Sequence, residues 1–316
     1  MISILIPSYN ASATIRSAIL SCLSQTYQDF EIIVLNPGSK DHTNEIIESF
    51  DDKRLTLLQT ENNTGIAASR NILLKAAKGQ FIAWLDADDI MMPERLEKQL
   101  NYFEKFPETD ILGTWISTDS DEVPIKRLPL KHNEIYHCLW FKNCMIQPSI
   151  MSRNFYLKEQ CFYDENFANS VEDYELWYRL RNSKKLANLN EVLTHYHMTV
   201  GEELNLKKRH NNFDSNLHKL WEIKWRNYPV AVSESERKSF IKFLYENIEP
   251  DEHDIKASLN VIYQLNILEK DDFFRLLLSY HKLRLWRNMR IVDKLRHLKI
   301  LTHLKYWNEF KQRHLI

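Results

Sequence analysis

Three aspartates stand close together in the stretch F-I-A-W-L-D-A-D-D-I-M-M-P, residues 81–93. Asp86, Asp88 and Asp89 follow a short apolar run that predicts a buried strand, and Pro93 is typical of a first helical turn. The carboxylates are therefore expected at the carboxyl end of a strand, where open α/β sheets bind ligands. Neighbouring acidic side chains repel one another unless a cation or solvent relieves them. A divalent metal is the first hypothesis, and a helix cap supplied by Asp89 is the alternative.

Short strands and helices alternate before and after this stretch. Apolar runs predict the strands, and apolar residues at spacings of three and four predict the helices. The expected strands are residues 2–6, 31–35, 55–58 and one starting at 81, with helices at 15–23, 41–50, 66–78 and 94–106. This order predicts βαβ units and a mostly parallel sheet. The turns at 7–10, 36–39 and 86–89 are therefore expected to line one edge.

The layout is that of a nucleotide-binding sheet, but the phosphate-binding glycine loops are missing. The sequence contains neither G-x-G-x-x-G nor G-x-x-x-x-G-K-[ST], and it has only five glycines. A metal held by carboxylates is the other way to neutralise a diphosphate.

The rest of the chain predicts a second, helical region. A strand at 111–117, a loop or hairpin at 118–131, an amphipathic helix at 171–180 and an apolar segment at 186–198 precede it. Beyond about residue 204 the pattern is helical and charged. We therefore expect one domain over residues 1–204 and a helical region, basic at its C-terminal end, over residues 205–316.

The charge of the chain is unevenly distributed. Residues 282–313 carry ten Lys or Arg and two acidic residues, a net of +8, so the remainder carries −9 for a total of −1. Cations among Trp and Leu at helical spacing suit an anionic membrane surface. Packing of the apolar face on the N-terminal domain is the alternative. A nucleic-acid partner is not expected, because no reader motif accompanies the charge.

Cysteine usage and hydropathy predict a cytoplasmic protein, peripheral at most to the inner face of the cell membrane. The four cysteines have neither zinc-like spacing nor a disulfide pattern. The N-terminus lacks the basic region of a signal sequence, and no apolar run reaches 18 residues.

Seven motifs in order give the chain a family resemblance. From residue 1 to about 201 it resembles the family 2 glycosyltransferases of the GT-A fold. The motifs are I-P-S-Y-N (6–10), S-Q-T-Y (24–27), E-I-I-V (31–34), G-S-x-D-x-T (38–43), N-x-G-x-x-x-x-R-N (63–71), D-A-D-D (86–89) and E-D-Y-E-L-W (172–177). The resemblance implies a Rossmann-like, mixed, mostly parallel sheet flanked by helices, with a nucleotide-diphosphate sugar bound across the strand ends.

The resemblance assigns a metal site to the aspartate stretch. Asp88 is implied as the direct ligand of Mn²⁺ or Mg²⁺, and Asp86 as a neighbour of the ribose or of the metal's water shell. His197 lies where many relatives place a histidine near the metal or diphosphate. The Tyr-Arg that usually precedes this histidine is Thr194-His195 here, so packing remains an alternative for His197.

The resemblance also assigns the acid and base chemistry. Asp173 matches the general base that removes a proton from the acceptor hydroxyl in an inverting transfer, and Glu172 is implied in acceptor binding. From the residues alone, both are better explained as first-turn acids favoured by the helix dipole.

The remaining matches concern the nucleoside. Pro7 and Tyr9 match residues that contact it, and Arg70 matches a residue near the base and phosphates, with a solvated helix face as the alternative. The family usually has two aspartates before Gly-Ser, but this chain has Asn36 and Pro37. Proline offers neither donor nor acceptor side chain, so Asn36 is the candidate to recognise the base.

The sequence therefore predicts an inverting, metal-dependent glycosyltransferase. It would move a sugar from a nucleotide-diphosphate donor, with UDP favoured, to a hydroxyl of a growing or lipid-linked glycan such as lipooligosaccharide or capsule. The alternative is a non-catalytic relative that binds nucleotide or acts as a scaffold in a membrane glycan-assembly complex.

Overall fold

The computed structural model describes residues 1–121, 124–167, 170–197, 210–227, 231–245 and 252–268. The chain divides into two compact units, Met1–Leu217 and His218–Ile316. The boundary expected at residue 204 lies among residues 198–209, outside the description, so that division stays a prediction.

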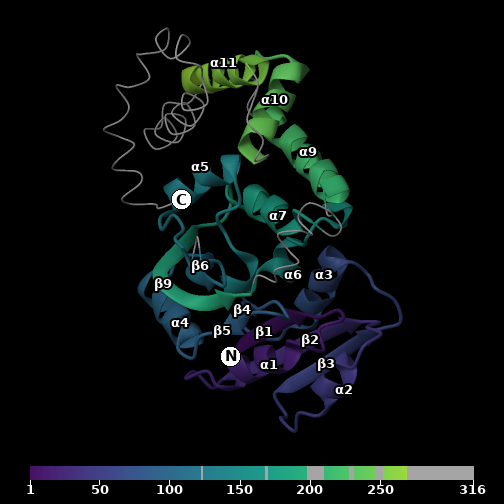
Figure 1. Cartoon of the computed structure of the whole chain (residues 1–316). Helices are drawn as coiled ribbons and strands as arrows, with labels where there is room; N and C mark the ends of the chain where they lie inside the picture. The colour runs from purple at the N-terminus through teal and green to yellow at the C-terminus, as the bar shows by residue number, and fades with distance from the viewer. Residues whose placement is uncertain (122–123, 168–169, 198–209, 228–230, 246–251, 269–316) are drawn as a thin grey trace. The chain divides into compact units, whose positions relative to one another are not determined.

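Three helices connect four parallel strands in the first part of the chain (Figure 1). The strands lie in the order β3-β2-β1-β4. They are β1 (Ile2–Pro7), β2 (Phe30–Pro37), β3 (Leu55–Thr60) and β4 (Phe81–Trp84), connected by α1 (Ile15–Leu23), α2 (Thr43–Glu48) and α3 (Ile66–Ala76). Every residue of β1 is buried, as expected for an apolar strand with parallel neighbours and covering helices. The alternation predicted from the sequence is confirmed.

An antiparallel strand beyond β4 makes the sheet mixed. β8 runs antiparallel to β4 and β6, whereas β9 runs parallel to β6. Within the described residues the order is β3-β2-β1-β4-β8-β6-β9-β5, with β7 paired to β6. The elements are β5 (Ile90–Met91), α4 (Arg95–Lys105), β6 (Ile111–Thr118), β7 (Ile125–Lys126), α5 (His132–Phe141), η1 (Gln147–Ser149), β8 (Met151–Arg153), α6 (Tyr156–Glu159), η2 (Glu165–Phe167), α7 (Glu172–Leu180) and β9 (Leu186–Tyr196). The predicted mixed α/β sheet with flanking helices is confirmed.

A buried arginine fixes the end of β4. Arg95 has no exposed surface, and its guanidinium donates to the carbonyl oxygens of Pro148 at 2.5 Å, Trp84 at 3.0 Å and Ile150 at 3.1 Å. These carbonyls belong to the end of β4 and to the segment that leads into β8. Since buried carbonyls need donors, Arg95 supplies them where the two strands stop pairing. It thereby holds the point from which the turn 86–89 begins.

The described part of the second unit is helical, as the sequence predicts. It contains most of α9 (His210–Asn227), then α10 (Glu234–Tyr245) and α11 (Glu252–Leu268). Trp221 anchors its core, with ring centroids 5.1 Å from Trp225 and 5.9 Å from Phe240. No helix among the described residues is long and apolar enough to cross a membrane. The basic segment 282–313 lies outside the described residues.

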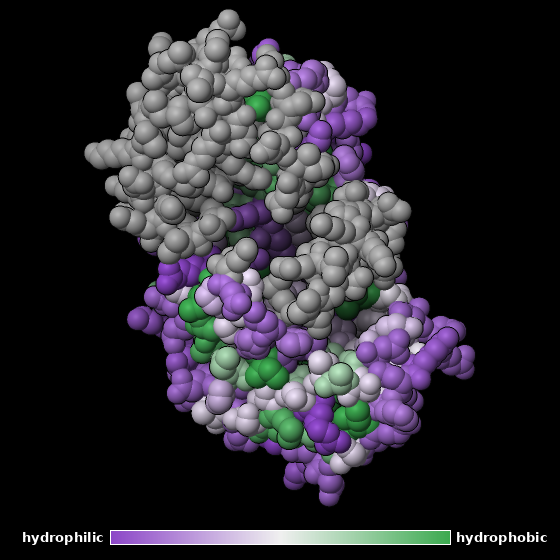
Figure 2. Space-filling model, in the orientation of Figure 1, coloured by the Kyte–Doolittle hydropathy of each residue, from purple (hydrophilic) through white to green (hydrophobic). Residues whose placement is uncertain are grey.

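The surface of the first unit carries its hydrophobic residues in small patches among hydrophilic ones on the face shown in Figure 2. Isolated exposed apolar residues are normal on the surface of a globular domain. Tyr9 differs from the other exposed apolar residues in its position. It lies in the turn that directly follows β1, where 44% of its surface is exposed.

Replacing Arg95 with Met is expected to lower the free energy of unfolding by about 3 kcal/mol, because the carbonyls of Trp84 and Pro148 lose the guanidinium as donor at about 1–3 kcal/mol each, while the Ile150 carbonyl still accepts from the Trp84 N–H. Urea unfolding followed by circular dichroism measures the change. Arg16→Met removes an exposed arginine of α1 and is the matched control, expected within about 0.5 kcal/mol of wild type. Equal stability of the two variants would contradict this role of Arg95.

Candidate functional site

The turns that follow β1 and β2 are hydrogen-bonded to each other. The Asn10 backbone N–H donates to Ser39 Oγ at 2.8 Å, and the Lys40 N–H donates to Asn10 Oδ1 at 3.0 Å. Pro7 is the last residue of β1 and is buried, while Tyr9 projects from the turn. The predicted meeting of these two turns at one edge of the sheet is confirmed.

Asn36 is buried beneath this edge, with 1% of its surface exposed. Its amide nitrogen donates to Asn44 Oδ1 at 2.7 Å, and its oxygen accepts from the backbone N–H and the hydroxyl of Ser39 at 3.3 and 2.5 Å. Both ends of the amide are therefore engaged inside the protein. Recognition of a nucleobase by Asn36 stays a prediction, and it requires exchange of one of these bonds.

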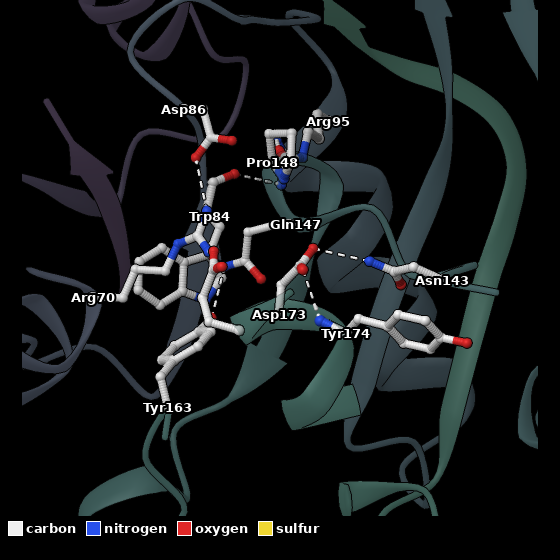
Figure 3. Close-up of polar contacts among 11 residues, drawn as sticks. Arg70, Trp84, Asp86, Arg95, Asn143, Gln147, Pro148, Tyr163, Asp173 and Tyr174 are labelled. Atoms are coloured by element: carbon white, nitrogen blue, oxygen red, sulfur yellow. Dashed lines mark hydrogen bonds and ion pairs between the residues drawn. The ribbon is translucent and has the colours of Figure 1, made fainter. Parts of the chain in front are cut away.

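Arg70 joins two acidic segments that are far apart in the sequence, and Figure 3 shows its contact with the first of them at Asp86. Its guanidinium forms an ion pair with Glu172 and lies 3.4 Å from Asp86 Oδ1. Only 4% of Arg70 is exposed, so the solvated-helix alternative for this residue is wrong. The neighbouring carboxylates, Glu172 foremost, raise the pKa of Arg70 against the effect of burial. The arginine is therefore a permanent positive charge at the centre of the site.

Asn71, the residue after Arg70, helps to position the Arg70 guanidinium. Asn71 Nδ2 donates to the Tyr163 carbonyl at 3.0 Å and Asn71 Oδ1 accepts from the Tyr163 N–H at 2.9 Å. The Tyr163 ring consequently packs with its centroid 5.5 Å from the Arg70 guanidinium and 5.7 Å from the Trp84 ring. Aromatic faces favour such a cation, and they limit the directions in which Arg70 can turn.

Asp173 lies at the start of α7, held from two sides. Asn143 Nδ2 donates to Asp173 Oδ2 at 2.9 Å, and the Tyr174 N–H donates to Asp173 Oδ1 at 2.7 Å. Val171, the residue before the helix, has φ +67°, a region that β-branched residues rarely occupy at a cost of about 1–3 kcal/mol. The surrounding structure therefore enforces the direction in which the first turn of α7 points.

The acids of α7 are in an environment that favours protonation. Burial raises the pKa of Glu172 to about 7, with Asp173 and Asp86 acting in the same direction and Arg70 opposing them. Burial also raises the pKa of Asp173, opposed by Arg70 and by the hydrogen bonds from Tyr174 and Asn143. Asp173 nonetheless keeps partial solvent exposure. A carboxylate with a raised pKa and solvent access is suited to take up a proton.

The three aspartates of the turn 86–89 differ in how deeply they are buried. Asp89 is fully buried, and its Oδ1 accepts from the His197 backbone N–H at 2.9 Å. Asp86 and Asp88 are only half-buried, which leaves room for the water and phosphate ligands of a divalent ion. The helix-cap alternative for Asp89 is wrong, because the N-cap of α4 is Glu94 and no side chain caps it.

The histidine expected beside the metal lies in a different cluster. His197 Nδ1 is 2.7 Å from Asp119 Oδ2, and His195 Nε2 is 2.9 Å from Asp119 Oδ1. The structure thus connects His197 to the aspartate turn through its backbone and to Asp119 through its ring. A metal shared by His197, Asp86 and Asp88 stays a prediction.

Several residues of the site are absent from the sequence-based assignment. Gln147 is 3% exposed and donates to the Tyr163 hydroxyl at 2.7 Å, while its Oε1 accepts from no described group. In Figure 3, Gln147 lies between Asp173 on one side and the residues around Arg70 on the other. Neither Asn143 nor Tyr163 belongs to a recognisable motif, so no sequence signal points to them. For His195 and His197, the alternation of side chains along a strand was the available signal.

Comparison with known proteins gives a consistent result. Residues 3–177 match the model for glycosyl transferase family 2. An uncharacterised glycosyltransferase of Methanocaldococcus jannaschii is 31% identical over 255 residues, which cover 78% of this chain and 83% of the relative. Escherichia coli WfgD, named a UDP-Glc:alpha-D-GlcNAc-diphosphoundecaprenol beta-1,3-glucosyltransferase, is 44% identical over 105 residues, covering 33% of this chain and 42% of WfgD. The solved structure of S. aureus TarS in complex with UDP aligns over 94% of this chain and 91% of the TarS chain, with a TM-score of 0.59 and 20% sequence identity. The two proteins therefore share a fold.

Arg70→Met is expected to lower the free energy of unfolding by about 3 kcal/mol at pH 7.5, because it leaves the buried Glu172 carboxylate without its cation. The loss is expected to shrink toward pH 5, where Glu172 takes up a proton. Urea unfolding at the two pH values measures both effects.

The double variant Arg70→Met/Glu172→Gln is the matched test, because it removes both partners. It is expected to be more stable than Arg70→Met alone at pH 7.5, and a double-mutant cycle gives the coupling energy. Additive effects of the two substitutions would contradict the ion pair.

Proposed function

Because the chain belongs to glycosyl transferase family 2, we propose that this glycosyltransferase is an inverting, metal-dependent enzyme whose donor is a UDP-linked sugar. The observation that carries the proposal is the contact of Arg70 with both Asp86 and Glu172. It brings the aspartate turn, whose carboxylates suit the divalent ion of a metal-bound diphosphate, next to the helix start that bears Asp173. A donor and a proton acceptor thereby have adjacent positions.

The donor side is assigned to the edge formed by the turns after β1, β2 and β4. Asp88 would bind Mn²⁺ or Mg²⁺ directly, with Asp86 near the ribose or the water shell of the ion and His197 close by. The ion, when bound, would neutralise the departing diphosphate. Pro7 and Tyr9 would contact the nucleoside.

The nucleobase is assigned from the turn after β2 and from the relatives. Asn36 would reach the base after releasing Ser39 or Asn44. A UDP donor is supported by the names of WfgD, a UDP-Glc transferase, and of the TarS complex with UDP.

The acceptor side is assigned to α7 and its surroundings. The acceptor oxygen attacks the anomeric carbon, the bond from that carbon to the phosphate oxygen breaks, and the hydroxyl proton passes to Asp173. Glu172 and Gln147 would position the acceptor. Attack from the side opposite the leaving diphosphate inverts the anomeric configuration.

The acceptor is proposed to be a hydroxyl of a growing glycan, such as lipooligosaccharide or capsule, presented on a lipid carrier. WfgD provides the support, since its printed acceptor is GlcNAc on diphosphoundecaprenol. The enzyme would then work in the cytoplasm at the inner face of the membrane. The basic segment 282–313 would contact anionic lipid there, with packing on the catalytic body as the alternative.

Substitutions of single carboxylates test the donor side and the acceptor side of the site separately. Asp88→Asn is expected to abolish Mn²⁺-dependent binding of UDP, measured by calorimetry. Asp173→Asn is expected to keep that binding and to lose about 10²–10⁴-fold in transfer rate, the usual contribution of a general base. Asp51→Asn removes an exposed aspartate and serves as the control.

Undiminished turnover in Asp173→Asn would overturn its role as base, and UDP binding without metal would overturn the role of Asp88. Wild-type protein that binds UDP but neither hydrolyses nor transfers any sugar would instead fit a scaffold.

The pH dependence of kcat/KM tests the base in a second way. Asp173 must be ionised to accept a proton, so activity is lost as pH falls through its raised pKa. Asn143 stabilises the ionised form by hydrogen bonding, so Asn143→Ala raises that pKa further and shifts the acid limb to higher pH. Asn101→Ala, at an exposed position of α4, is expected to leave the limb in place. An unchanged limb in Asn143→Ala would contradict the assignment.

A further inference from the structure

Two lysines from different elements lie near Asp173. Lys126 is the last residue of β7, which pairs with β6 at Ile116. Lys142 directly follows α5 and precedes Asn143, whose amide donates to Asp173 Oδ2 at 2.9 Å. The end of α5 therefore places one cation next to the residue that orients Asp173.

The two lysines act on the same neighbouring groups. Burial of the Lys126 ammonium group among protein atoms lowers its pKa, Lys142 lowers it further, and Asp173 acts in the opposite direction. Burial raises the pKa of the Cys144 thiol, and both lysines oppose this rise. Charges act on one another in this way when they are near neighbours. Both ammonium groups therefore lie near each other and near Asp173.

Neither lysine is neutralised by a carboxylate within the described part of the chain, where the two side chains form no ion pair and no hydrogen bond. Lys184 shows the contrast, because its ammonium group lies 2.5 Å from Glu159 Oε2. Lys126 is an exposed residue and Lys142 is half-buried, so solvent reaches both. Lys126 is thus recessed among protein atoms and still accessible, which is the position of a cation that can meet a ligand.

The charge of Lys126 is unfavourable to the fold. A lowered pKa means that the folded protein disfavours the charged form, so this charge costs stability at neutral pH. The dipole of α5 accounts for a cation at Lys142, but not for a second one at Lys126, which lies on a strand. Perturbed charges of this kind are concentrated at functional sites, which favours a role in binding an anion.

We propose that Lys126 and Lys142 together bind the diphosphate of a lipid carrier to which the acceptor sugar is attached. This inference rests on the proposed function, in which the acceptor is a lipid-linked glycan, and it identifies the part of that acceptor that the protein recognises. Two ammonium groups suit a diphosphate, because each supplies a compact positive charge and three hydrogen-bond donors.

The position of this diphosphate subsite beside Asp173 fits an acceptor that carries a single sugar. In such a molecule the diphosphate is bonded to the same ring as the attacking hydroxyl. Lys126 and Lys142 would hold the diphosphate while Asp173 takes up the hydroxyl proton. The subsite would therefore select the first sugar on the carrier over a neutral sugar or the distant end of a long glycan.

Calorimetric titration of the full-length chain with geranyl diphosphate in EDTA tests the subsite without donor or metal. We expect saturable binding to wild type, and binding at least about tenfold weaker in Lys126→Met and in Lys142→Met, because each loses a charge-assisted contact. Lys53→Met removes an exposed lysine elsewhere and is the matched control, expected to bind like wild type. Lys126→Arg keeps the charge and is expected to bind more tightly than Lys126→Met. The Tm of Lys126→Met is expected at or above that of wild type, which separates lost binding from lost folding.

Three results would overturn the proposal. No saturable binding to wild type would leave the two lysines as solvated charges. Undiminished binding in both Met variants would place the diphosphate elsewhere, and equally tight binding of geraniol would assign the binding to the geranyl chain. None of these results touches Mn²⁺-dependent UDP binding or the dependence of transfer on Asp173. Conversely, geranyl diphosphate binding without turnover of any donor would remove the proposed function and leave the diphosphate subsite, so the two can fail separately.

Discussion

The ion pair between Arg70 and Glu172 is the interaction on which the arrangement of the site depends. It spans 102 residues of sequence and joins α3 to the first turn of α7, and the same guanidinium faces Asp86 at the end of β4. Removing an ion from water costs several kcal/mol, which a buried pair recovers only with good geometry and further partners. Here the Tyr163 and Trp84 rings and a second carboxylate provide them. The charge therefore fixes where the two functional segments meet.

The carboxylates around this charge differ in solvent access, and this difference separates their chemistry. Asp86 and Asp88 are half-buried at the sheet edge, where an ion can complete its shell with water and phosphate. Glu172 is buried, and burial raises its pKa to about 7, which suits an acid that changes protonation near neutral pH. Asp173 keeps partial exposure while two hydrogen bonds orient it. One acidic neighbourhood thus holds the half-buried carboxylates proposed to bind the cation and the hydrogen-bonded aspartate proposed to accept the proton.

The sequence predicts the frame of the fold well because hydrophobic period and turn residues are local signals. The strands β1 to β4 and the helices α1 to α4 follow from them, and the D-A-D-D and E-D-Y-E-L-W motifs identify both acidic segments. The contacts that bring the two segments together are between residues distant in sequence. Tyr163 lies beside Arg70 because Asn71 binds the Tyr163 backbone, and Asn143 binds Asp173 from 30 residues away. The spacing of residues in the sequence does not indicate either contact. The strand β8 is too short for a periodic signal, and Asp119 lies in a polar stretch without a motif.

The central claim, that this edge of the sheet binds a nucleotide-diphosphate sugar through a carboxylate-held metal, is tested most directly by a hydrolysis screen. A panel of nucleotide-sugars is incubated with wild-type protein and Mn²⁺, and release of the nucleoside diphosphate is measured with and without EDTA. The account predicts slow hydrolysis of a UDP-sugar that EDTA abolishes and that added Mn²⁺ restores. Hydrolysis unaffected by EDTA, or no turnover of any donor with any divalent metal, would contradict it.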